Sequence, residues 1–134
     1  MFTYIGPSVS TNWPCNNQAI TSTGGTSTAV DISGAEGPII ISVAVASGGT
    51  NSMAIAVTQS TTLGGTYTAV PAANLLNASG VASTFAAVST AGSIQTLFLN
   101  RVNSEEFIAL SFTGGTLTQT VSATISFIQK YITL

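Results

Sequence analysis

The chain has 134 residues, and only six of them are charged: Asp31, Glu36, Arg101, Glu105, Glu106 and Lys130. The formal net charge is −2 and there is no histidine, which excludes Ser-His-Asp and Cys-His catalysis and a His-ligated zinc site. Two cations are too few to neutralise a nucleic-acid backbone, which excludes nucleic acid as a partner.

Such a small number of charges also bears on solubility. An average soluble domain of this length would carry about thirty charged residues. Because charge keeps free proteins apart in solution, we expect a structural protein whose surface is covered by neighbours in a large assembly. We expect no enzyme activity, no cofactor and no metal. An uncharged surface also favours association of the chain with itself, so we expect a homo-oligomer.

At the N-terminus, residues 1–16 differ from the rest of the chain. Prolines and asparagines that break regular structure alternate there with the large apolar residues Phe2, Tyr4, Ile5 and Trp13. This segment is either a lid packed on its own domain or an extended arm that reaches a neighbouring subunit. Residues 17–134 are expected to form one domain. The C-terminal residues 131–134, which include Tyr131 and Leu134, leave the same two alternatives.

Further along the chain, strand formers and turn residues alternate. Residues 38–46, 52–59 and 119–129 place apolar side chains at every second position, as in antiparallel sheets packed on a core. A helical turn or two is expected at 71–77, where Pro71 suits a helix start. The pattern predicts an all-β fold, an antiparallel β-sandwich of the jelly-roll or immunoglobulin-like kind. Its strands are expected near 17–22, 28–32, 38–46, 52–59, 66–70, 83–88, 94–100, 106–112 and 119–129.

The tripeptide Gly-Gly-Thr occurs four times, at 24–26, 48–50, 64–66 and 114–116. Paired glycines reach the positive φ that two-residue hairpin turns require. We therefore expect the third and fourth strands to pair across Gly48-Gly49, and the last two strands to pair across Gly114-Gly115.

Three features of the sequence could carry chemistry. Cys15 is the lone cysteine and has no nearby cation to lower its pKa, so a passive packed thiol is expected; an unpaired cysteine suits a chain made in a reducing cytoplasm. The adjacent carboxylates of Glu105 and Glu106 would point to opposite faces of a strand and would not converge on a substrate. Residues 31–37 could offer oxygen ligands to Ca²⁺, but we expect Asp31 instead to hydrogen-bond the turn at Gly34.

Membrane insertion and export are not expected. The first residues lack the basic segment and the long apolar segment of a signal peptide. The longest apolar stretch, residues 39–46, is too short to cross a bilayer as a helix.

The order of turns and strands from about Thr28 to Lys130 is similar to that of a known protein family. An Asp-and-Gly turn at 30–37 precedes the apolar strand at 38–46. A second strand, a polar stretch and Tyr67-Thr68-Ala69-Val70 follow. Late in the chain, Arg101 precedes a strand, a glycine hairpin and Val121-Ser122-Ala123. In this order the chain resembles the decoration, or cement, proteins of tailed-bacteriophage heads. It departs from them at 59–62, which is often acidic in the family, and at the basic entry to the late strand, which is reduced to Arg101.

The resemblance implies a virion subunit that is made in the host cytoplasm, binds the major capsid protein on the capsid exterior and clamps neighbouring shell proteins, often as a trimer. Two alternatives stay open: a tail- or fibre-associated receptor- or glycan-binding module, in which Trp13 and Tyr67 could stack on sugar, and a shell- or tube-forming capsid subunit. Exposed salt bridges contribute little to an interface, and buried aromatic residues dominate interface energetics. The expected partner-binding residues are Phe2, Tyr4, Trp13, Tyr131 and Leu134.

Overall fold

The computed structural model describes residues 4–5, 8–129 and 132–133, and in this part of the chain nearly all regular structure is β-strand. Two single 3-10 turns, η1 and η2, are the helical elements of the described residues. All strand pairs are antiparallel, as the sequence predicts. The elements in chain order are β1 Tyr4–Ile5, β2 Ser8–Thr26, β3 Val30–Asp31, β4 Ala35–Ser47, β5 Ala54–Ser60, β6 Thr68–Ala69, η1 Ala72–Asn74, β7 Leu75–Leu76, β8 Ser93–Asn100, η2 Arg101–Asn103, β9 Phe107–Gln129 and β10 Ile132–Thr133.

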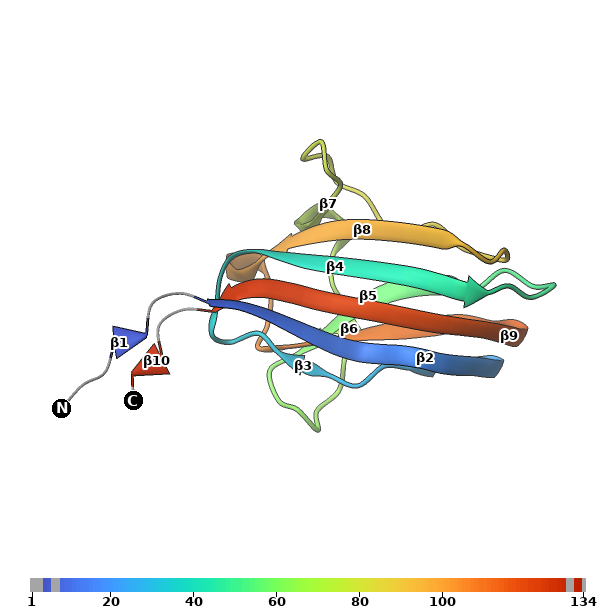
Figure 1. Ribbon diagram of the computed structural model, residues 1–134, viewed down its shortest axis with the longest axis horizontal. Coiled ribbons are helices and arrows are strands. Elements are labelled where there is room, and N and C mark those ends of the chain that lie inside the picture. The colour runs from blue at the N-terminus through green and yellow to red at the C-terminus, as the bar shows by residue number, and fades with distance from the viewer. Residues whose placement is uncertain (1–3, 6–7, 130–131, 134) are drawn as a thin grey trace.

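The main sheet is curled so that two parts of it face each other (Figure 1). The long strand β9 joins these parts, because residues 107–113 pair with β5 and residues 120–129 pair with β4. We call them the β4 half, which also contains β7, β8 and residues 8–22 of β2, and the β5 half, which also contains β3, β6 and residues 24–26 of β2.

A single hydrophobic core lies between the two halves. The alternating residues of the predicted strands supply it: Ile41 and Ile125 from the β4 half and Val57 from the β5 half are all buried. The inward faces predicted for 38–46, 52–59 and 119–129 are therefore confirmed. Phe112 and Leu110 fill the middle of the core from the early part of β9.

The two predicted hairpins are wrong, although the chain does reverse direction at both places. Strand β4 pairs with β8 and β9, whereas β5 pairs with β6 and β9, so β4 and β5 lie in opposite halves and do not pair across Gly48-Gly49. Likewise Gly114-Gly115 lies within β9, where the chain passes from the β5 half to the β4 half. Each reversal thus connects facing halves rather than neighbouring strands.

Close approach of neighbouring backbone, not positive φ, is what requires glycine at these two reversals. Neither Gly48 nor Gly114 has positive φ. A Cβ on Gly48 would lie 2.7 Å from the Ser89 carbonyl oxygen, and one on Gly114 would lie 2.8 Å from the Ser52 carbonyl oxygen. Real Cβ atoms essentially never come so close to a backbone atom, so only glycine fits.

Two further expectations need correction. Residues 83–88 do not form a strand; the Gln95 side chain instead accepts from the Ala86 amide at 2.7 Å and donates to its carbonyl at 3.0 Å, in place of a neighbouring strand. The helical turn expected at 71–77 is the single 3-10 turn η1, and the strand β7 follows it at once.

The boundary expected between residues 16 and 17 falls inside β2. From Ser8 onward this strand pairs with β9, with register shifts between Asn12 and Cys15 and between Cys15 and Gln18. Residues 8–16 therefore lie on their own domain. Before them, β1 pairs with β10 in a separate two-stranded sheet, which we call the terminal ribbon.

Candidate functional site

The structure separates the five predicted partner-binding residues. The backbone of Tyr4 lies in the terminal ribbon, opposite Thr133. Figure 1 shows this ribbon beyond the ends of β2 and β9. Trp13 lies on β2 and is 60% exposed. Phe2, Tyr131 and Leu134 lie outside the described residues. The N- and C-terminal segments are thus brought together as one unit, whereas Trp13 belongs to the main sheet.

Trp13 is part of a broad uncharged surface, the outward side of the β4 half, which we call the outer face. Strand register fixes its rows. Ile94 of β8 lies opposite Ala44 of β4, and Ala44 lies opposite Ser122 of β9. Towards the terminal ribbon, Ile40 lies between Phe98 and Ser126, and Val9 lies opposite Ile128.

Large apolar side chains gather on this face. Eight such side chains are exposed among the described residues, and five of them belong to the outer face: Val9, Trp13, Ile40, Ile94 and Ile128. Small hydroxyl residues separate them, such as Ser42, which shares a 2.9 Å hydrogen bond with Thr96. One charged residue, Glu36, lies opposite Ile128 at the border of the face. Most of the outer face therefore offers apolar contact and neutral hydrogen bonds.

Two shallow hollows mark the outer face. The first, of about 140 Å³, lies between Trp13 and Ile94, over Ala44 and Thr124. The second, of about 150 Å³, is lined by Val9, Ile40 and Ile128, together with Pro38. Each could receive an apolar side chain from a partner.

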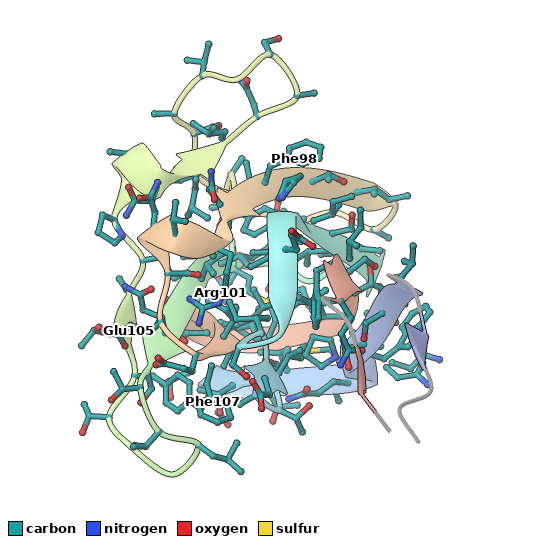
Figure 2. All side chains as sticks on the ribbon, turned by 90° about the vertical axis from the view of Figure 1, so that its left-hand side faces the viewer. Phe98, Arg101, Glu105 and Phe107 are labelled. Carbon is teal, nitrogen blue, oxygen red and sulfur yellow. The ribbon has the colours of Figure 1, made fainter. Side chains whose placement is uncertain are left out.

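The charged residues gather instead at one end of the molecule, which we call the charged end. All five that the structure describes, namely Asp31, Glu36, Arg101, Glu105 and Glu106, lie where β3 and β8 end and β4 and β9 begin. Figure 2 looks onto this end, with Arg101 near its middle and Glu105 at its side. Lys130 lies outside the described residues. Sequence spacing gave no sign of this grouping, which only the strand register produces.

Arg101 is used within the fold. Its Nε donates to the Ile32 carbonyl at 3.0 Å and its Nη1 donates to the Ser104 carbonyl at 2.9 Å. The bond to Ile32 joins the turn η2 after β8 to the connection after β3, and so ties the two halves together, whereas the bond to Ser104 stays within the connection from η2 to β9. The one described cation is thereby held by backbone carbonyls of its own chain.

The loop at Asp31 is a hydrogen-bonded turn, as predicted. The Ser33 amide and hydroxyl both donate to Asp31 Oδ1, at 2.9 and 2.6 Å. These two hydrogen bonds hold the pKa of the Asp31 carboxyl below its usual range. The carboxylate is thus occupied by its own turn, with the Arg101 charge as a smaller stabilising influence.

The other chemical candidates stay apart. Among the described residues, no three Cys, Asp or Glu side chains gather as a metal site would require. Cys15 is buried, and burial raises the pKa of its thiol to about 11. Glu105 and Glu106 lie between η2 and β9 rather than on a strand, and both are half-buried; Glu106 Oε2 has no hydrogen-bond partner among the described atoms.

Tyr67 lines a groove of about 410 Å³ on the β5 half, far from the Trp13 hollow in the strand order. Its hydroxyl donates to the Leu63 carbonyl at 2.9 Å. Thr58, Ala109 and the chain at 26–29 complete the groove, which contains neither a carboxylate nor an amide side chain. Trp13 and Tyr67 therefore do not meet in one sugar-stacking site.

No helix in the described part of the chain has the length and hydropathy that a membrane crossing requires. Comparison of the chain with protein-family models, with curated proteins and with solved structures found no match.

Proposed function

We propose that this chain is a structural protein of a tailed-bacteriophage head, which binds the major capsid protein on the capsid exterior and stabilises contacts between capsid subunits. The observation that carries the proposal is the broad, almost uncharged outer face, which is suited to burial in an assembly. The described charges occupy one end, while the outer face presents large apolar side chains among hydroxyls. The order of segments shared with phage decoration proteins supplies the kind of particle.

The proposal also covers the type of β-fold and the place where the chain is made and acts. A curled antiparallel sheet with facing halves is compatible with a β-sandwich of jelly-roll or immunoglobulin-like type. The chain is made in the host cytoplasm and acts on the virion as a homo-oligomer. Its adhesive contribution comes from burying apolar and neutral polar surface across capsomer boundaries, so that separating them costs more free energy.

The terminal ribbon is the proposed anchor to the capsid. A two-stranded ribbon is marginally stable by itself in water, so contact with a partner would stabilise it. Its four described residues are Tyr4, Ile5, Ile132 and Thr133, three of which are large and apolar by type. Neighbouring Phe2, Tyr131 and Leu134 add further apolar residues in the sequence.

The test is co-sedimentation of the purified chain with heads and tails of the phage whose genome encodes it. We expect binding to heads and not to tails. Deleting residues 1–5 should weaken binding sharply, because β1 is lost while β2 is kept. The control Glu105→Gln changes a charge at the charged end and should bind like the wild type. Binding of the wild type to neither particle would contradict the proposed function. Full binding of the deletion variant would contradict the role of the terminal ribbon as the anchor.

The deletion has to stop before β2. Residues 8–14 cover the edge of β9 next to Phe127, which is buried in the core. A longer deletion would therefore uncover the core and confuse loss of binding with loss of folding.

A glycan-binding tail module is the second candidate, favoured by the groove at Tyr67. Its lining offers hydroxyl groups and one aromatic ring but lacks the carboxylates or amides that sugar sites usually supply. Binding to tails, lost on Tyr67→Ala, would favour this candidate. Assembly of the chain alone into closed shells or tubes would favour the third, a shell- or tube-forming subunit.

A further inference from the structure

The outer face is large enough to be a protein interface. It spans four strands, β8, β4, β9 and β2. Four strands about 4.8 Å apart and seven residues at about 3.3 Å each cover about 450 Å². Two copies packed on this face would therefore bury about 900 Å² of flat area, which is below the size of stable interfaces and typical of weak, transient ones.

The corresponding surface of the β5 half differs in kind. The exposed residues on its strands are small, since Ala54 lies opposite Thr113 and Ala56 opposite Ser111, and its exposed large apolar side chain is Leu63, in the loop after β5. Sheets that pack face to face bury side chains from both inner faces. A contact between unlike faces would bury large side chains from one copy only, whereas a contact between two outer faces buries them from both.

The outer face also suits self-association electrostatically. A two-fold interface brings the same patch of both copies together, so a charged patch would repel itself. Among the residues that the structure describes, Glu36 is the one charge on this face, at the border near the charged end. The face also offers both protruding side chains and hollows, with Trp13 beside one hollow and Val9 beside the other.

We propose that the outer face is where a second copy of this chain docks, outer face to outer face, about a two-fold axis. This goes beyond the proposed function, since it assigns the outer face to self-association and leaves the terminal ribbon for the capsid. It also replaces the trimer that the resemblance implies with a pair. The small area predicts a dimer that dissociates on dilution, with a dissociation constant of about micromolar or weaker.

A lysine in the middle of the face is the sharpest perturbation. Thr124 lies opposite Ser42, between the rows of Ile94 and Ile40. In the dimer, Thr124→Lys would bury an unpaired charge from each copy in an apolar contact. Because a buried charge loses its hydration, this carries a large free-energy cost. The monomer should fold normally, because residue 124 points away from the core. The matched control is Thr113→Lys, an exposed threonine on the small-residue surface of the β5 half.

Sedimentation equilibrium from micromolar to about millimolar concentration measures the result. We expect the wild type and Thr113→Lys to approach twice 13.5 kDa with the same dissociation constant, and Thr124→Lys to stay monomeric, weakened at least 100-fold. A wild type that remains monomeric, or a larger oligomer that Thr124→Lys does not disturb, would overturn the proposal. If the wild type is monomeric at all concentrations and Thr124→Lys no longer binds heads, then the capsid protein covers this face instead.

A second, conservative pair of variants guards against a folding artefact. Val9→Thr on the outer face and Val102→Thr on η2 make the same change at side chains that are 75% and 83% exposed. We expect about tenfold weaker dimerisation for the first, and no change for the second. Equal effects of the two variants would overturn the assignment to the outer face. Because this measurement contains no phage particle, its failure and failure of the proposed function are distinguishable.

Discussion

Gly24 is the position where one added methyl group should cost most. It lies in β2 at the point where this strand passes from the β4 half to the β5 half, opposite Thr113. Its φ is +138°, a conformation that residues with a Cβ rarely adopt. A Cβ there would also overlap the Phe112 carbonyl oxygen, and Phe112 is at the centre of the core.

The magnitude for Gly24→Ala follows from these two effects. Strained backbone costs about 1–3 kcal/mol, and forcing an atom into a filled site costs about 1–3 kcal/mol more. We expect a loss of about 2–6 kcal/mol in the free energy of unfolding, out of the 5–15 kcal/mol that is typical of a domain. For a chain of this size the melting temperature should fall by about 10–20 °C.

Gly64→Ala is the matched control, because Gly64 is also the first glycine of a Gly-Gly-Thr. It has no positive φ, and a Cβ there would have nothing within 4 Å. Its substitution should change stability by less than about 1 kcal/mol, in the stabilising direction. Urea unfolding followed by far-UV circular dichroism gives both values. Equal stabilities for the two variants would refute the argument that positive φ and the close Phe112 carbonyl require glycine at position 24.

Three further predictions concern single side chains. Gln119 is buried and its Nε2 donates to the Asn51 carbonyl at 2.6 Å, so Gln119→Leu should lower the free energy of unfolding by about 1–3 kcal/mol; an unchanged urea midpoint would contradict this. The Cys15 thiol, with its pKa raised to about 11, should react with an aromatic disulfide at mild alkaline pH only after unfolding. Since the folded pKa is the higher one, stability should also fall as the pH rises from about 9 to 11, a fall that Cys15→Ala should lack. The Asp31 carboxyl, whose pKa is lowered first by the Ser33 hydroxyl, should contribute stability above its ordinary pKa that is lost as the pH falls through the lowered value. Ser33→Ala should return that pKa towards its usual range in an NMR titration, and an unmoved pKa would be evidence against the turn.

The inward faces of the strands could be predicted from sequence because period-two alternation is local. Ile41, Val57 and Ile125 each follow from their immediate neighbours, and all three are buried. The partner of each strand is not local. Gly48-Gly49 indicates that the chain reverses, but nothing near it indicates that β4 and β5 pair with different parts of β9. That choice depends on contacts between residues more than forty positions apart.

The same limit explains what sequence reasoning missed at the candidate site. Trp13 could be predicted as a contact residue because it is a large aromatic side chain in the N-terminal segment, and it is exposed. Ile40, Ile94 and Ile128 occur in three different strands, so no window of the sequence contains them together. Register alone gathers them beside Trp13 and sends the charged residues to one end. The roles of Trp13 and of the terminal residues in binding stay predictions.

The salt dependence of binding to phage heads tests the central claim most directly. The proposed contacts are apolar and neutral, and screening weakens only interactions between charges. We predict that the fraction of chain bound to heads, measured by co-sedimentation, is the same in about 50 mM and in about 1 M NaCl. Release of the chain from heads at the higher salt concentration would show that charged groups hold it there and would contradict the account.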